Sequence, residues 1–293
     1  MFRNFIRNVF FCIIKPKVMK RIIVLMAFIT LQLAYAQQYD ISTDYKFTYL
    51  CTYQPDSTDR QNLETERFVV LYNSKNHRSL FMPEGKFNKD SLIIHNGDRM
   101  EIVRNASRFK SKIPYLVFTD REKQKTFVVG EVNNQKIYYE TPVASIAWTE
   151  KDSTRLEKGL ILRLAEADFG GRHWLAWYAP SYPYDVGPYK FHGLPGTIVY
   201  LYDDRNHYFF KLDKIEKRSF HYPLDLQNAA TTEPEGFFKR LLLLKLRSSL
   251  VMLKRYNVTI SVENGTQENV TLDDMIREAE EKARRFNNPL ELD

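Results

Sequence analysis

Cysteine is scarce in this chain of 293 residues, which contains only Cys12 and Cys51. Two cysteines make no thiolate cluster for a metal centre, and no two of the six histidines stand at a ligand spacing such as H-x-x-x-H. The 11 glycines form neither a G-x-G-x-x-G phosphate loop nor a G-x-S-x-G nucleophile elbow. The sequence therefore predicts no metal and no cofactor.

Long apolar runs are missing as well. The run from Ile22 to Leu33 is shorter than the ~20 residues that cross a bilayer, so we expect no integral membrane span. It follows Met19-Lys20-Arg21 and precedes Ala34-Tyr35-Ala36, which is the order of a secretory signal peptide. We expect residues 1–36 to be the signal peptide region, with Met19 as the true start and with export to the periplasm or the medium.

Outside residues 1–36, the chain also lacks an excess of either charge sign. Residues 1–36 hold six of the 43 basic residues and none of the 36 acidic ones, which leaves 37 basic against 36 acidic residues. Such a balance gives no support for a nucleic-acid partner. Cys12 lies in the same region, so Cys51 has no disulfide partner in the remainder, and stability has to come from burial.

Aromatic residues, by contrast, are abundant: 18 tyrosines and 20 phenylalanines favour β-strands with cross-strand ring pairs. Strict alternation from Tyr45 to Tyr53 puts Cys51 on one face with four aromatic rings, which is typical of a buried core thiol rather than a nucleophile. Residues 86–112 fit either a short helix or an insertion lying over the sheet. Further strands are predicted over residues 68–72, 79–82, 115–119, 127–132, 146–148, 159–167, 197–202 and 208–212.

The C-terminal part changes from strand to helix periodicity. Thr232-Glu233-Pro234 begins a helix with a broad apolar face, which fits burial against a sheet better than contact with a membrane surface. A second helix is predicted from Thr271 to Arg285. No linker or repeat divides residues 37–293, so we expect a single α+β, mainly β domain.

The segment Gly187–Gly196 (GPYKFHGLPG) concentrates glycine and proline around aromatic rings. Leu194-Pro195-Gly196 suits a type II turn, which predicts a positive φ at Gly196. The run Thr197–Tyr202 is apolar on both faces and predicts a strand buried on both sides. The loop before it either plugs a corner of the fold or forms the wall of a site. Its motif residues are Gly187, Pro188, His192, Gly193, Leu194, Pro195 and Gly196.

Gly193 to Gly196 and Ile198 resemble the signature of the GLPGLI family, exported proteins of Bacteroidetes-type bacteria, with Thr197 where the family prefers leucine. The leader and the ending Asn287–Leu292 are also similar to that family. The family is in turn similar to the bowl-like N-terminal domain of a bacterial peptide:N-glycosidase, which lies beside the catalytic centre. The resemblance thus implies a curved, mainly antiparallel sheet, a bowl or half-barrel, with C-terminal helices, and carries no catalytic residues.

Aromatic rings also gather before the signature. Ring faces beside a charged group such as Arg172 or Asp185 bind sugars or peptides by stacking, although the same rings also fit a hydrophobic core. The candidate ligand-binding residues are Arg172, Trp174, Trp177, Tyr182, Tyr184 and Tyr189.

Two histidines lie on the flanks of the same loop. Folding would be able to join His173 and His192 with Asp168 or Asp185 into a His/carboxylate site, so the weak catalytic candidates are His173, His192 and Asp185. His192 before a glycine turn fits a hydrogen bond to a backbone carbonyl equally well.

The leading hypothesis is an exported, non-enzymatic binding or accessory protein whose partner is an envelope protein, a peptide or a glycan. One alternative is a hydrolytic enzyme that uses the two histidines. Another is a structural partner of an outer-membrane complex. The distances among the histidines and carboxylates, and the opening of the aromatic rings onto a pocket, distinguish binding from hydrolysis.

Overall fold

A computed structural model describes residues 38–95, 97–255, 277, 281 and 288–292. The chain divides into a small unit, Met1–Asp40 with Pro223–Asn228, and a large unit, Ile41–Tyr222 with Ala229–Asp293. In the small unit, the Asp225 carboxylate accepts a hydrogen bond from the backbone N–H of Gln227 at 2.9 Å. The predicted signal peptide region lies outside the described residues, as does the second C-terminal helix except for residues 277 and 281.

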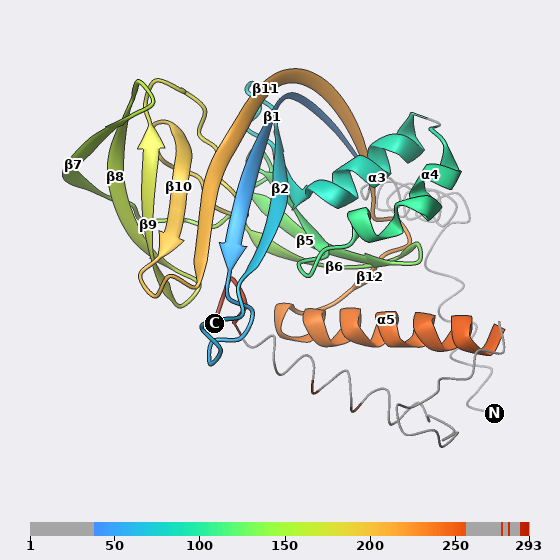
Figure 1. The fold of residues 1–293 in the computed structure, drawn as a ribbon. Coiled ribbons are helices and arrows are strands. Elements are labelled where there is room, and N and C mark those ends of the chain that lie inside the picture. Colours follow the sequence, from blue (N-terminus) through green and yellow to red (C-terminus); the bar gives the residue numbers. More distant parts are fainter. Residues whose placement is uncertain (1–37, 96, 256–276, 278–280, 282–287, 293) are drawn as a thin grey trace, which may run out of the picture. The chain divides into compact units, whose positions relative to one another are not determined.

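One sheet contains the twelve strands that the structure describes (Figure 1). Its order is β12-β6-β5-β4-β3-β2-β1-β11-β10-β9-β8-β7, so β12 and β7 form the two edges of an open sheet. Pairings between sequence neighbours are antiparallel, and β12 pairs with β6 in parallel. The predicted class, a mainly β protein with a curved antiparallel sheet, is confirmed. The strands are β1 (Gln38–Tyr53), β2 (Glu64–Tyr72), β3 (Ser79–Pro83), β4 (Tyr115–Asp120), β5 (Lys125–Val132), β6 (Gln135–Pro142), β7 (Thr149–Glu157), β8 (Leu160–Phe169), β9 (Arg172–Ala179), β10 (Thr197–Asp203), β11 (Tyr208–Asp225) and β12 (Ala230–Thr231).

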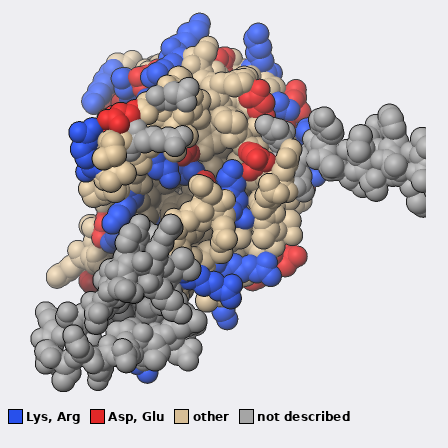
Figure 2. Space-filling view, turned by 90° about the vertical axis from the view of Figure 1, so that its right-hand side faces the viewer, with Lys and Arg blue, Asp and Glu red and all other residues tan. Residues whose placement is uncertain are grey.

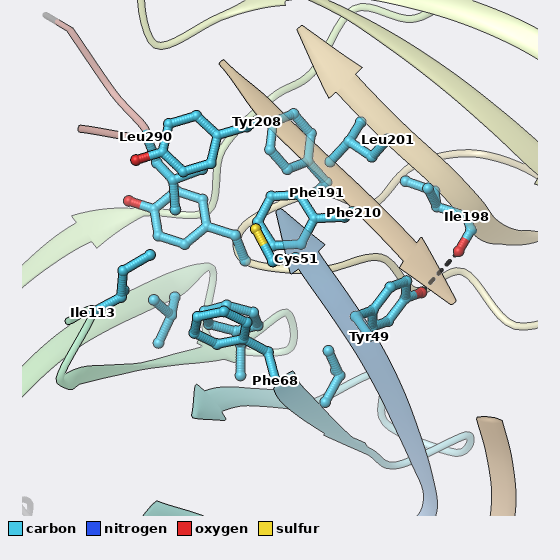
Figure 3. Packing of buried hydrophobic residues seen from close by; sticks show 14 of the residues in the cluster. Tyr49, Cys51, Phe68, Ile113, Phe191, Ile198, Leu201, Tyr208, Phe210 and Leu290 are labelled. Carbon is cyan, nitrogen blue, oxygen red and sulfur yellow. Dashed lines mark hydrogen bonds between the residues drawn. The ribbon is translucent and has the colours of Figure 1, made fainter. Parts of the chain in front are cut away.

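The alternation in β1 forms the centre of the core. Tyr49, Cys51 and Tyr53 point to one face, and each is at most 1% exposed. Figure 3 shows the free thiol of Cys51 beside the ring of Phe210, and burial raises the pKa of this thiol well above its usual range. The hydroxyl of Tyr49 donates to the carbonyl of Ile198 at 2.8 Å, the dashed line in Figure 3. The prediction of a buried core thiol is confirmed.

Strand β10 is buried on both faces, as its pattern predicts, but two other parts of the sheet differ from expectation. β7 has the sequence TEKDSTRLE and lies exposed at the edge, so no apolar alternation marks it. Residues 146–148 form no strand. The indole of Trp148 instead donates to the backbone carbonyl of His192 at 2.8 Å, which holds this segment to a loop rather than to a neighbouring strand.

Residues 86–112 are expected to form either a short helix or an insertion. The segment between β3 and β4 is both, because it is an insertion made of short helices. It consists of α3 (Glu84–Ile94), α4 (Arg99–Arg104) and the 3-10 helix η1 (Ala106–Phe109). Phe87 of α3 is 5% exposed, and its ring lies 4.9 Å from that of Phe220 in β11. At the start of α4, the Asp98 carboxylate accepts from the N–H of Met100 at 2.8 Å, an N-cap of the usual kind.

Helix α5 (Pro234–Arg255) begins at the predicted proline and packs on β5 and β6 (Figure 1). Phe237 and Leu241 are buried, and the ring of Phe237 lies 5.1 Å from that of Tyr139 in an edge-to-face contact. Gly130 of β5 permits this approach, since a Cβ there would lie 2.7 Å from a Leu241 methyl group. The prediction that this helix covers the sheet is therefore confirmed.

Charges of both signs are interspersed on the face seen in Figure 2, with uncharged surface between them. Within the described part of the chain, no helix combines the length and the apolar character needed to cross a membrane.

Candidate functional site

The signature loop, residues 180–196, joins β9 to β10, and hydrogen bonds hold it to the start of β10. The N–H of Thr197 donates to the carbonyl of Tyr182 at 2.9 Å, and the N–H of Ile198 donates to that of Val186 at 3.0 Å. The Thr197 hydroxyl also donates to the carbonyls of Tyr182 and Tyr184, at 3.3 and 3.2 Å. The backbone thus fixes the positions of Tyr182 and Tyr184.

Gly196 closes the loop, but not through a type II turn. The glycine with a positive φ in this loop is Gly193, at 97°, so the prediction of a positive φ at Gly196 is wrong. The N–H of Gly196 donates to the carbonyl of Leu194 at 2.8 Å, which makes a three-residue turn around Pro195. Glycine is required for space instead, because a Cβ would lie 2.4 Å from the carbonyl oxygen of Ala179.

The middle of the signature loop fills the core. The ring of Phe191 lies 4.7 Å from that of Trp174 in β9, and the ring of Tyr189 lies 6.0 Å from that of Phe81 in β3. The ammonium group of Lys190 lies 5.7 Å from the ring centroid of Tyr139 in β6. The sheet therefore curves around this part of the loop, which acts as a plug. Trp174 and Tyr189, two candidate ligand-binding residues, are only 0% and 7% exposed.

Arg172 anchors the C-terminal segment. One guanidinium nitrogen donates to the Asp203 carboxylate at 2.9 Å, and neither side chain is more than 1% exposed. The other donates to the side chain of Asn288 at 2.5 Å and to the carbonyl of Pro289 at 2.6 Å. The hydroxyl of Tyr208 adds a bond to the carbonyl of Asn288 at 2.7 Å. This candidate ligand-binding residue thus lies in a buried network that joins β9, β10, β11 and the chain end.

His192 and Asp185 lie together within the signature loop. The Asp185 carboxylate accepts from the N–H of Gly193 at 2.5 Å and pairs with Arg121, which also donates to the Asp185 carbonyl at 2.8 Å. Burial, and then the positive charge of Arg121, lower the pKa of His192 to about 4. The imidazole is therefore neutral at physiological pH.

Acid should destabilise the fold through His192. The unfolded chain binds a proton at this residue near pH 6.5, whereas the folded protein binds it only near 4. Between these values the unfolded state carries more protons, so stability falls as pH falls, by up to ~1.4 kcal/mol per pH unit for this group. Urea unfolding at pH 7 and 4.5 should show a smaller loss for His192→Gln than for the wild type. Equal losses in both proteins would exclude His192 as the cause.

His173 lies on the opposite face of β9 from the buried ring of Trp174. Its Nδ1 is 2.8 Å from Asp168 and its Nε2 is 3.7 Å from Glu166, both on β8, and the bond to Asp168 raises the pKa of His173. The catalytic candidates are therefore divided between two clusters: His173 on the exposed face, and His192 with Asp185 in the loop. Among the residues that the structure describes, no group of three or more His, Cys, Asp or Glu side chains is arranged so that it could hold a metal ion.

A cavity of about 510 Å³ lies where the signature loop meets β8, β10 and β11. Tyr182 and Tyr184, two candidate ligand-binding residues, line it beside Tyr200 of β10 and Tyr45 of β1. We call this space, defined by these four residues, the tyrosine cavity. The signature loop therefore has two parts, since its middle plugs the core while its beginning lines a cavity.

The rings of Tyr45 and Tyr184 form a fixed pair. Their centroids are 4.4 Å apart and their planes are tilted by 44°. A hydrogen bond between the two hydroxyls, followed by burial, raises the pKa of Tyr184 to about 12, so this ring stays uncharged over the physiological range. Because partners hold both the backbone and the hydroxyl of Tyr184, its ring is positioned before any ligand arrives.

Trp177, the sixth ligand-binding candidate, supports the wall of the tyrosine cavity from outside its lining. The guanidinium of Arg155 lies 4.6 Å from the Trp177 ring and 4.5 Å from that of Tyr200. Glu157 accepts a hydrogen bond from the Tyr200 hydroxyl, and burial, followed by this contact, raises the pKa of Tyr200 to about 12. The cation and the two rings keep Tyr200 in place as a rigid wall.

The sequence pattern alone misses Tyr45 and Tyr200 as lining residues. Tyr45 is part of the core alternation of β1, and Tyr200 belongs to a strand with two apolar faces. Each therefore reads as core. Only the order of strands, which puts β1 beside β11 and β11 beside β10, brings them to one cavity.

No family model and no curated protein matches this sequence, so the resemblance to the GLPGLI family stays a prediction. Among solved structures, PNGF-II, a peptide:N-glycosidase, is similar in space groups C2 and P21, at 13% identity and TM-scores of 0.47 and 0.46. The matches cover 71% and 70% of this chain but 33% of the PNGF-II chain, so this chain spans about a third of PNGF-II. Likeness at this level assigns no residue, ligand or activity.

Proposed function

We propose that this protein is an exported, non-enzymatic binding or accessory protein of the GLPGLI type, and that its ligand lies in the tyrosine cavity. The observation that carries the proposal is the fixed ring pair of Tyr45 and Tyr184 in a space of about 510 Å³. Small-molecule sites typically measure ~300–1,000 Å³ and combine apolar walls with a few polar groups. The leader pattern in residues 1–36 supports export.

The walls of the tyrosine cavity suit a ligand with both apolar and polar surfaces. Leu162 and Val199 contribute apolar area, and the tyrosine rings add flat faces with hydroxyl edges. The backbone bonds of the signature loop fix these groups in advance, so binding costs little side-chain ordering. This arrangement favours recognition of a small ligand.

The hydrolytic alternative has weaker geometric support. General acid–base catalysis requires His173, His192 and Asp185 within reach of one substrate. His173 lies among carboxylates on the exposed face of β8 and β9, whereas His192 is half-buried beside Arg121. Binding therefore fits the arrangement better than hydrolysis.

Replacing Tyr184 with alanine should weaken binding by about tenfold or more, because the variant loses one ring of the pair. The probes are a panel of neutral and acidic disaccharides and tripeptides, followed by ligand-detected NMR. Tyr202→Ala is the matched control, since Tyr202 is a half-buried tyrosine of β10 outside the lining. Tyr184→Phe keeps the ring and should retain most of the affinity.

Two results would contradict the proposed site. One is binding that survives in Tyr184→Ala, and the other is binding that Tyr202→Ala weakens equally. If no member of the panel binds the wild type, a small-ligand function for this cavity is excluded for those classes.

A further inference from the structure

The carboxylates that line the tyrosine cavity are already engaged. Glu157 pairs with Arg155 at 3.2 Å and accepts from the hydroxyl of Tyr200. Asp213 pairs with Arg67 at 2.6 Å. Neither carboxylate is therefore available to neutralise a lysine of the lining, and neither offers a free anion to a cationic ligand.

The lining also contains four lysines, and three of them have no such engagement. Lys214 pairs with Glu216 at 3.0 Å. Lys158, Lys211 and Lys217 form no ion pair with any described carboxylate. The ammonium group of Lys211 lies 5.9 Å from the centroid of the Tyr200 ring, at the wall of the cavity. Unpaired cations around a concave space raise the local concentration of anions there.

The uncharged part of the cavity lining indicates the chemical class of the rest of an anionic ligand. A dry slot between parallel rings would suit a flat aromatic acid, but the rings of Tyr45 and Tyr184 are tilted by 44°. The lining mixes leucine and valine with tyrosines and charged side chains, and the space is open to solvent. A pyranose ring matches this mixture, because its C–H face packs on a tyrosine ring while its hydroxyls stay hydrated or hydrogen-bonded.

We infer that the tyrosine cavity binds an acidic carbohydrate, with a sugar ring against Tyr184 and a carboxylate among Lys158, Lys211 and Lys217. This inference rests on the proposed function, because it names the ligand class of the same cavity. The tyrosines supply affinity for the sugar ring. The lysines select the acidic sugar over its neutral counterpart, since an ammonium–carboxylate ion pair forms only with the acidic sugar.

The test compares cellobiouronic acid, a disaccharide with one carboxylate, with cellobiose, its neutral counterpart, by isothermal titration calorimetry. The acidic sugar should bind the wild type at least about tenfold more tightly, and this advantage should shrink as sodium chloride is raised. Lys211→Met and Lys217→Met should each weaken binding of the acidic sugar while leaving that of cellobiose unchanged. Lys239→Met on α5, outside the lining, should change neither.

The outcomes separate this inference from the proposed function. If Tyr184→Ala weakens both sugars and the wild type binds them equally, the cavity is a binding site but the acidic specificity is refuted. If phenylacetate binds more tightly than cellobiouronic acid, the ligand is an aromatic acid and the carbohydrate class is wrong. If neither sugar binds the wild type, the inference fails. Unfolding curves of each lysine variant that match the wild type show that a lost affinity is not a folding defect.

Discussion

Replacing Arg172 with methionine should lower the free energy of unfolding by about 3–5 kcal/mol, the usual effect of removing one partner from a buried ion pair. Asp203 would be left charged at 0% exposure, without the guanidinium that it faces at 2.9 Å. The same change removes the bonds to Asn288 and Pro289, so the C-terminal segment loses two of its polar attachments. Urea unfolding followed by tryptophan fluorescence measures the loss.

The matched control is Arg104→Met on α4. Arg104 pairs with Asp98 at 2.8 Å, but both side chains are more than half exposed, and such pairs contribute less than ~1 kcal/mol. A double variant, Arg172→Met with Asp203→Leu, should recover part of the loss because no buried charge remains. The N–H of Tyr208 would still lack its acceptor on Asp203, so recovery should be incomplete. A single-variant loss no larger than that of Arg104→Met would contradict this account.

The sequence predicts a strand or helix where the buried positions of that element carry a periodic pattern of apolar residues. Most of the buried positions in β1 and β10 carry apolar residues, so their patterns reveal them. Among the described strands, β7 lies at the edge and pairs with β8 alone, and its exposed residues need no apolar pattern. The insertion between β3 and β4 buries mainly Phe87, which leaves too weak a pattern to distinguish a helix from a loop.

The candidate site was predictable only in part, because its residues meet through the order of strands. Tyr182 and Tyr184 stand in a visibly aromatic loop, and both line the cavity. Lys211 and Lys217 lie on β11, and nothing near them in the sequence connects them with that loop. Arg172 shows the reverse case, since its partner Asn288 lies 116 residues further along the chain. A charged residue beside aromatic rings was therefore interpreted as a binding group although it forms a structural anchor.

Gly196→Ala should also destabilise the protein strongly, by about 2–3 kcal/mol or more, for a reason that the sequence did not reveal. The added Cβ would lie 2.4 Å from the carbonyl oxygen and 2.7 Å from the carbonyl carbon of Ala179. These are backbone atoms, which no rotamer change moves away, so the start of β10 has to shift from its place beside the end of β9. The hydrogen bonds of Thr197 to the signature loop should weaken with it.

Gly159→Ala is the comparison that distinguishes a steric clash of the added Cβ from backbone strain. Gly159 has a φ of 81°, so alanine there costs about 1–2 kcal/mol of backbone strain, but no atom lies within 4 Å of the new Cβ. Gly196 has no positive φ and has backbone in the way. If packing is the cause, Gly196→Ala should lose more stability in urea than Gly159→Ala. A smaller loss at Gly196 would mean that β10 relaxes away from Ala179 at little cost, and that the signature glycine is not held by this close approach.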